Sequence, residues 1–157
     1  MGIPQFEPEL IPLDHPRRED QYRVEIDGVK SSFSSLSIGN PHAVILVDDV
    51  STANVETIGP ALEAHPLFPQ RVNVGFMHIV DRNHFDLRVF ERGVGETQAC
   101  GSGACAAMAA GYNLGFLDSP ATATLLGGQL ELEWQGEGNP VMMTGSTAMV
   151  YEGEIDR

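Results

Sequence analysis

The feature that most constrains the fold is an apolar helix-forming segment that directly follows a glycine-rich loop. Residues 104–110 carry only alanine, cysteine and methionine side chains and form the strongest helix-forming run of the chain. A helix that is apolar on every side must be buried on every side. We therefore expect a helix over about residues 101–114 to lie in the core, packed against a sheet.

The remainder of the chain is dominated by short β-type runs. Residues 22–26 alternate in polarity and lead into the turn pair Asp27–Gly28, which is typical of a hairpin. Further runs, separated by Gly, Pro and polar breaks, predict strands over residues 33–38, 43–47, 72–80, 85–90, 122–126, 130–134 and 141–151. Residues 55–65 have the apolar spacing of an amphipathic helix. About eight strands and two helices indicate an α+β fold.

The length and composition fit one compact domain. A chain of 157 residues with 42% hydrophobic residues can bury a sizeable core. Residues 1–20 contain four prolines and mixed charge, so we expect an extended connecting segment there. The domain itself is expected over residues 21–157.

The charge balance excludes several classes of partner. The chain has 9 Lys and Arg against 22 Asp and Glu, a formal net charge of −13, and residues 93–156 contain no basic residue. Such a surface repels phosphate backbones and anionic lipids, so we expect neither nucleic-acid nor membrane partners. The chain also lacks a signal-peptide pattern and any long apolar run, which predicts a cytoplasmic protein.

Cys100 lies where the glycine-rich loop becomes the helix. Unpaired N–H groups and the dipole of a helix N-terminus stabilise an anion, so this position predicts a lowered thiol pKa and a catalytic role. The same N–H groups could hold a substrate carboxylate. Cys105, one turn further, is interpreted as a buried small hydrophobe. Two cysteines at this spacing are too few for a metal site, so no metal is expected.

Two other motifs overlap this segment and are disfavoured. The pattern Gly101-x-Gly103-x-x-Ala106 fits a dinucleotide-binding turn, but no acidic residue follows at the required distance. Residues 98–101 match part of the caspase signature, with His42 a plausible distance upstream. Ser102 breaks that signature, and the chain has few bases with which to bind an acidic side chain.

Three stretches resemble the diaminopimelate epimerase family: GNPH at residues 39–42, RVNVGF at 71–76, and ERGVGETQACGSG at 91–103. The resemblance extends over nearly the whole chain. It implies a mostly antiparallel sheet or barrel wrapped around a central helix. It also implies cofactor-independent interconversion of LL- and meso-diaminopimelate, in lysine and peptidoglycan precursor synthesis. The family is built from two similar domains, and this chain resembles the C-terminal one, which implies a missing N-terminal domain as its partner.

The resemblance also implies roles for individual residues. Cys100 would be one of two acid/base thiols, and His42 and Glu91 would tune the pKa values of these thiols. Tyr151 matches a position at the family's dimer contact, so the full-length protein is expected to be a homodimer. Substrate-binding roles are implied for Asn40, Asn73, Glu91, Arg92, Gly101 and Ser102.

The chemistry of such an epimerisation sets a limit on what this chain can do. Inverting an α-carbon requires a base on one face and an acid on the other. Cys105 cannot serve as the second thiol, since it would approach from the same side as Cys100. We therefore expect the chain alone to be inactive. Two alternatives remain open: an isolated domain that only binds ligand or dimerises, and a related isomerase such as a proline racemase.

Overall fold

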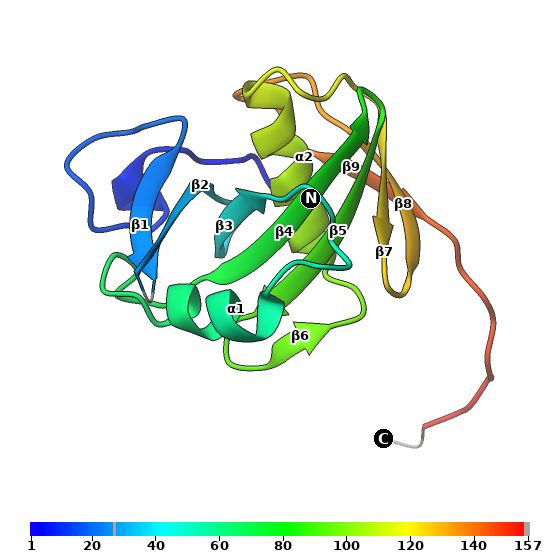
Figure 1. The fold of residues 1–157 in the computed structure, drawn as a ribbon. Coiled ribbons are helices and arrows are strands. Elements are labelled where there is room, and N and C mark those ends of the chain that lie inside the picture. Colours follow the sequence, from blue (N-terminus) through cyan, green and yellow to red (C-terminus); the bar gives the residue numbers. More distant parts are fainter. Residues whose placement is uncertain (27, 156–157) are drawn as a thin grey trace.

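The structure, a computed structural model, describes residues 1–26 and 28–155 (Figure 1). Within these residues nine strands form one sheet, accompanied by two α-helices and one 3-10 helix. The helices are η1 (Pro8–Leu10), α1 (Val55–Glu63) and α2 (Gly101–Asn113). The strands are β1 (Tyr22–Ile26), β2 (Val29–Ser37), β3 (Pro41–Leu46), β4 (Asn73–Asp81), β5 (His84–Glu91), β6 (Gly95–Thr97), β7 (Ala121–Leu125), β8 (Gly128–Glu133) and β9 (Met142–Gly145).

The sheet is mixed but mostly antiparallel. Its strand order is β1-β2-β3-β4-β5-β7-β8-β9, and the short β6 pairs with β5. The pairs β3–β4 and β5–β7 are parallel, whereas the other pairs are antiparallel. The predicted α+β class is confirmed.

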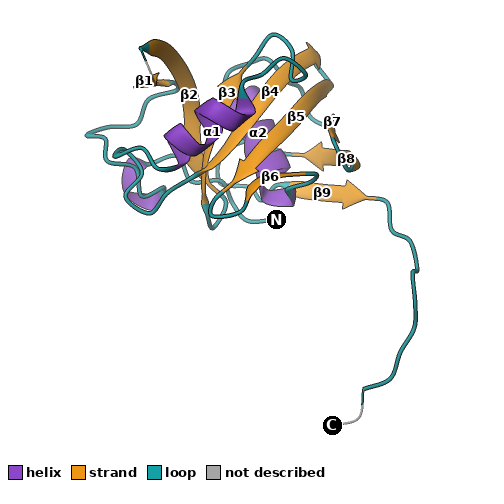
Figure 2. Ribbon diagram, turned by 60° about the horizontal axis from the view of Figure 1, so that its bottom comes forward, coloured by secondary structure: helices purple, strands orange, loops and turns teal. Residues whose placement is uncertain are grey.

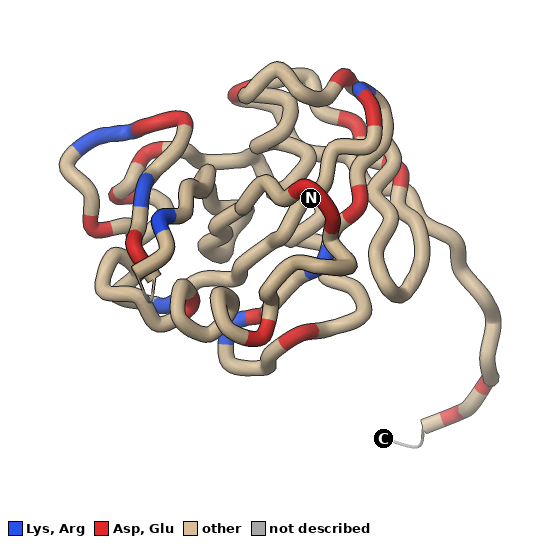
Figure 3. The backbone as a smooth tube through the Cα atoms, viewed as in Figure 1, with Lys and Arg blue, Asp and Glu red and all other residues tan. Residues whose placement is uncertain are grey.

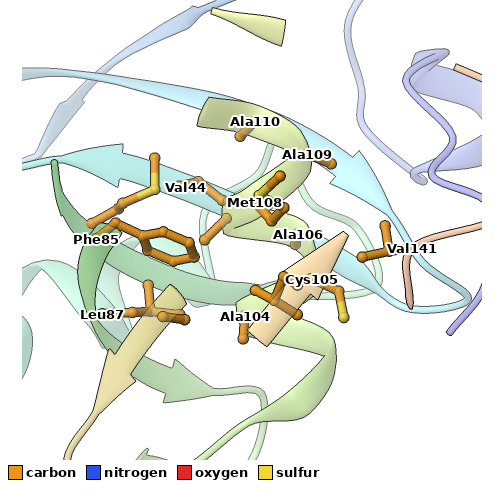
Figure 4. Packing of buried hydrophobic residues seen from close by; sticks show 14 of the residues in the cluster. Val44, Phe85, Leu87, Ala104, Cys105, Ala106, Met108, Ala109, Ala110 and Val141 are labelled. Atoms are coloured by element: carbon orange, nitrogen blue, oxygen red, sulfur yellow. The ribbon is translucent and has the colours of Figure 1, made fainter. Parts of the chain in front are cut away.

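Helix α2 is the centre around which the sheet curves. It contacts β2, β3, β4, β5, β7, β8 and β9, and residues 103–111 are buried. Figure 4 shows alanine side chains of α2, together with Cys105 and Met108, directed toward surrounding side chains such as Phe85, Leu87 and Val141. Gly111 lets a neighbour approach closely, because a Cβ there would lie 2.6 Å from a Leu117 methyl carbon. The expectation that an all-apolar helix occupies the core is confirmed.

Helix α1 packs over the opposite face of the sheet, in a second core cluster (Figure 2). Successive residues of β4 point to alternate faces: Val74 and Phe76 belong to this second cluster, whereas Met77 packs in the cluster around α2. Because β4 is covered on both faces, its first five residues are all buried. The sheet is thereby sandwiched between the two helices.

The two ends of the chain differ in how they pack. In residues 1–20, Gln5 forms an isolated bridge with Ser37, and Ile11 and Leu13 are buried in the second core cluster. The strand expected over residues 141–151 was too long. β9 ends at Gly145, and residues 146–155 extend away from the body without strand pairing (Figure 1).

The hairpin expected near the start of the domain forms. β1 and β2 pair in antiparallel register, with Ile26 opposite Val29. Asp27, part of the predicted turn pair, lies outside the described residues. Gly28 has a φ of +80°, a backbone conformation that favours glycine.

Acidic residues dominate the C-terminal half, as the sequence predicts. Figure 3 shows acidic and no basic residues on the β7–β8 hairpin and on the described tail. Among the described residues, neither helix has the length and apolarity needed to span a membrane.

Candidate active site

The strand topology brings the candidate residues together at one side of the sheet, where neighbouring strands begin or end. Because β3 and β4 are parallel, both begin at this side of the sheet, and His42 and Asn73 are direct register partners there. β2 and β5 run antiparallel to these strands and therefore end at the same side. Asn40 follows the end of β2, and Glu91 is the last residue of β5. α2 also begins here, because Ser102 in its first turn lies within hydrogen-bond distance of Asn40. The fold thus gathers residues that are up to about sixty positions apart in sequence.

Cys100 is the N-cap residue of α2. Its backbone is extended, with φ −138° and ψ 102°, and its carbonyl accepts the first helical hydrogen bond from Ala104. The Sγ atom lies 3.6 Å from Ser102 Oγ. Gly103 allows this packing, since a Cβ there would lie 3.3 Å from Cys100 Sγ and 3.1 Å from a Val89 methyl carbon.

The expected lowering of the Cys100 pKa is wrong for this chain. Cys100 is only 6% exposed, and this burial is the largest cause of a raised pKa. The Ser102 hydroxyl and the Gly103 N–H lower the pKa, whereas Glu91 raises it further. Loss of solvation outweighs the helix N-terminus because a thiolate loses more by leaving water than these hydrogen bonds return. Cys100 is therefore a protonated thiol at neutral pH in this structure.

Cys105 is more deeply placed than Cys100. It is fully buried, and burial raises its pKa to about 11. It belongs, with Val141 and Met108, to the core cluster around α2 (Figure 4). Its interpretation as a small core hydrophobe is confirmed.

We predict that the two thiols differ in reactivity. In the folded chain, iodoacetamide should alkylate Cys100 faster than Cys105, because only Cys100 has any exposed surface and its pKa is raised less severely. Both should react more slowly than after denaturation. Peptide mass spectrometry over a time course measures the two rates, and equal rates in the folded protein would contradict the placement of α2.

A hydrogen-bonded chain joins a buried imidazole to the thiol. Asn40 Nδ2 donates to Ser102 Oγ at 3.4 Å, and Ser102 in turn contacts Cys100. His42 Nε2 lies 3.1 Å from Asn40 Oδ1. An amide oxygen can only accept, so the His42 ring carries its proton on Nε2. His42 thereby fixes the orientation of the Asn40 amide.

His42 is neutral in this arrangement. It is 1% exposed, and burial is the main cause that lowers its pKa to about 4, with a smaller contribution from the positive charge of Arg92. The neutral ring, with its proton on Nε2, can donate to Asn40 Oδ1. The contacts that lead from His42 to Cys100 run through Asn40 and Ser102.

The depressed pKa of His42 predicts a pH-dependent stability. The unfolded chain binds a proton at His42 near pH 6.5, but the folded chain does so only near pH 4. Between these values the unfolded state binds more protons, so the free energy of unfolding falls as the pH falls, by up to about 3 kcal/mol from this group. Urea unfolding of wild type and His42→Gln across this range isolates the effect. Identical pH slopes in the two proteins would refute it.

Asn73 bridges two backbone segments of the site. It is 4% exposed; its Nδ2 donates to the Pro41 carbonyl at 3.0 Å, and its Oδ1 accepts from the Arg92 N–H at 3.0 Å. One amide N–H and one acceptor lone pair remain for a ligand. Asn73 therefore positions β3 and the turn after β5, whatever else it binds.

Glu91 and Arg92 lie at the end of β5 with different surroundings. Glu91 is half-buried and accepts a 2.5 Å hydrogen bond from Thr97 Oγ1. Arg92 is exposed, and its guanidinium donates to the Gln70 carbonyl at 3.0 Å. Within the described part of the chain, no carboxylate lies at ion-pair distance from Arg92. Its remaining donors are available to an anionic ligand.

The remaining predicted residues lie at the start of α2 and on the C-terminal tail. Gly101 and Ser102 form the first turn of α2 beside Cys100, whereas Tyr151 lies on the extended tail and is 83% exposed. The roles of Thr97 and Gly103 were not anticipated, although both lie in the motif over residues 91–103.

In residues 1–26 and 28–155, no three His, Cys, Asp or Glu side chains group as metal ligands.

The comparison with protein families decides to which family this chain belongs. Residues 34–150, most of the chain, match the family model described as diaminopimelate epimerase. The chain belongs to the diaminopimelate epimerase family. The matched region contains every candidate site residue except Tyr151, which follows directly after it.

Curated relatives agree with the family model. A diaminopimelate epimerase of Ectopseudomonas mendocina is 55% identical over 155 residues, which cover 99% of this chain and 56% of the relative. Those of Pseudomonas savastanoi pv. phaseolicola and Azotobacter vinelandii are 53% and 52% identical with the same coverage. The chain thus spans little more than half the length of these epimerases.

Solved structures add little. A putative phenazine biosynthesis PhzC/PhzF protein from Clostridium difficile gives a TM-score of 0.47 at 21% identity, covering 60% of this chain and 34% of that protein. A PhzF family protein from Bacillus anthracis gives 0.46 at 19% identity, with coverages of 72% and 34%. Likeness at this level carries no argument about diaminopimelate epimerase chemistry.

Proposed function

We propose that this chain is the C-terminal part of a diaminopimelate epimerase, an isomerase of lysine biosynthesis that interconverts the LL and meso forms. In this proposal Cys100 supplies one of two acid/base thiols. The second thiol comes from the N-terminal part of the enzyme, within the 44% of the relatives' length that this chain does not cover. Family membership and the geometry around Cys100 support the proposal.

The observation that carries the proposal is the position of Cys100 at the N-terminus of a buried helix. The first N–H groups of an α-helix have no partner within the helix. In α2 the Ala104 N–H bonds the Cys100 carbonyl, and the N–H groups of Gly101 and Ser102 precede it. A substrate carboxylate bound to these two groups would place its α-carbon close to the thiol.

The reaction needs two thiols in opposite protonation states. A thiolate on one face removes the α-proton, and a thiol on the other face delivers a proton to the carbanion, so the two sulfurs exchange roles in the reverse direction. No cofactor takes up the charge in this proposal; the helix N–H groups stabilise it on the carboxylate. The raised pKa of Cys100 suits it to begin as the proton donor.

The far end of the substrate would meet residues at the start of β4 and at the end of β5. Arg92 can grip a carboxylate through two parallel N–H donors. Glu91 would face an ammonium group of the diamino acid. Asn40 and the second N–H of the Asn73 amide would bind the remaining polar atoms, an arrangement that would favour a long diamino-diacid over proline.

Recombination of the two parts of the enzyme tests the proposal. The purified chain is mixed with the N-terminal part of the Ectopseudomonas mendocina relative in D2O, with LL-diaminopimelate as substrate. Inversion should appear with both parts present and with neither part alone, because the carbanion can otherwise be reprotonated only from its own face. Chiral chromatography and loss of the Cα–H NMR signal provide the readouts.

The same assay separates the alternatives. Inversion by the chain alone would refute the two-thiol proposal. Proline racemisation by the recombined parts would favour a related racemase, and ligand binding without proton exchange would favour a binding module. Sedimentation of wild type and Tyr151→Ala in the recombined enzyme tests the proposed homodimer contact.

A further inference from the structure

Glu63, the last residue of α1, is a buried carboxylate outside the residues assigned so far. Its side chain is 9% exposed, and its Oε1 accepts a 2.7 Å hydrogen bond from the Gly93 N–H. The same oxygen lies 3.4 Å from Arg71 Nη1. A buried carboxylate destabilises the fold unless its oxygens are hydrogen-bonded, so these contacts account for its presence there.

The Gly93 contact fixes the turn that carries Glu91 and Arg92. This turn closes through the Val94 N–H, which donates to the Glu91 carbonyl at 3.1 Å, and Gly93 adopts a φ of +75° within it. The Arg92 N–H is held by Asn73 Oδ1. With Gly93 held by Glu63, each N–H that follows Glu91 in the turn has a fixed acceptor.

The Arg71 contact fixes the segment that leads into Asn73. Arg71 has a φ of +59°, a conformation that is unfavourable for a residue with a side chain. Its N–H donates to the Phe68 carbonyl at 2.8 Å, and its guanidinium pairs with Glu63. One carboxylate on α1 thus contacts both the Arg71 side chain before β4 and the Gly93 N–H in the turn after β5.

We infer that Glu63 is a positioning residue of the proposed site, which sets the orientation of Glu91 and Arg92 through the Gly93 N–H. The inference rests on the proposed function, since it concerns how substrate-binding residues are held. In this inference Glu63 does not touch the substrate. It affects the reaction only by holding the backbone of the turn that carries Glu91 and Arg92.

The first test measures the hydrogen bond itself in the purified chain. Amide hydrogen exchange of Gly93, followed by NMR, should accelerate about 10-fold or more in Glu63→Ala, because a hydrogen bond to a charged acceptor is lost. Glu56→Ala is the matched control, since Glu56 is an exposed carboxylate on the same helix. Unchanged exchange at Gly93 in folded Glu63→Ala would overturn the inference.

Glu63→Gln keeps the test decisive if Glu63→Ala does not fold. The neutral amide oxygen can still accept from Gly93, but a bond to a neutral acceptor is about half as strong as one to a carboxylate. Exchange at Gly93 should therefore accelerate less than in Glu63→Ala, yet measurably. No change in Glu63→Gln would overturn the inference.

The second test measures catalysis in the recombined enzyme. Misplacement of Glu91 and Arg92 should lower kcat/KM for diaminopimelate by about 10- to 100-fold in Glu63→Ala, with partial rescue in Glu63→Gln and no change in Glu56→Ala. Rates are normalised to folded protein, so that a purely structural role would leave kcat/KM unchanged. If kcat/KM is unchanged in Glu63→Ala while the wild type is active, the inference about Glu63 is overturned and the proposed function stands. An inactive wild type would overturn the proposed function and this inference with it.

Discussion

Replacing Cys100 by alanine in the recombined enzyme should lower the rate of diaminopimelate inversion by about 10²- to 10⁴-fold, the usual contribution of a positioned acid/base group. The second thiol could still remove the α-proton from the one stereoisomer whose α-proton points toward that thiol. Without Cys100, reprotonation can come only from the same side. One stereoisomer should therefore exchange its α-proton with D2O without inverting, while the other does neither.

The matched control for this prediction is Cys105→Ala. Cys105 lies one turn along the same helix but is fully buried in the core cluster, so its loss should leave the inversion rate nearly unchanged. Chiral chromatography reports inversion, and Cα–H NMR in D2O reports exchange. Undiminished inversion by Cys100→Ala, or an equal loss in Cys105→Ala, would show that Cys100 is not the acid/base group.

Replacing Cys105 by aspartate should destabilise the folded chain by about 3–5 kcal/mol, because an unpaired charge would be buried against an apolar core. That loss is a large share of the 5–15 kcal/mol that stabilises a typical domain. The position is enclosed by α2 and the surrounding strands, with no exposed surface through which water could solvate the carboxylate. Urea unfolding monitored by circular dichroism measures the change.

Leu126→Asp provides the control for charge alone. Leu126 is 63% exposed, so a carboxylate there remains in water and should change the free energy of unfolding by less than about 0.5 kcal/mol. Cys105→Ala should cost less than Cys105→Asp, since it removes only one sulfur. Similar losses in Cys105→Asp and Leu126→Asp would place α2 outside the core.

The fold was predictable where local patterns reflect burial. The alanine run of α2 has no polar face to present to water, so its burial follows from the sequence alone. The strands around it were located by runs of β-forming residues between glycine and proline breaks. The expected strand over residues 141–151 extended too far, because Val150 and Tyr151 have strand-forming side chains but lie on a tail that pairs with no strand of the described sheet.

The candidate site was predictable as a set of motifs but not as an arrangement. The stretch at residues 91–103 pointed to Glu91, Arg92 and Cys100. Nothing in the sequence showed that the Asn73 amide bridges β3 and the turn after β5, since that depends on the parallel register of β3 and β4. Glu63 left no signal either, because a glutamate at the end of an amphipathic helix is usually solvated.

Local sequence patterns were enough to predict the α+β class, the buried helix and the family, and to propose Cys100 as the candidate thiol, because each depends on short runs of neighbouring residues. The tertiary structure alone decided the protonation state of that thiol. The helix N-terminus is a local feature and favours the thiolate. The surrounding strands exclude solvent and Glu91 adds negative charge, and both effects raise the pKa of Cys100. Desolvation is a sum over every neighbour that excludes water, and those neighbours are known only once the chain has folded.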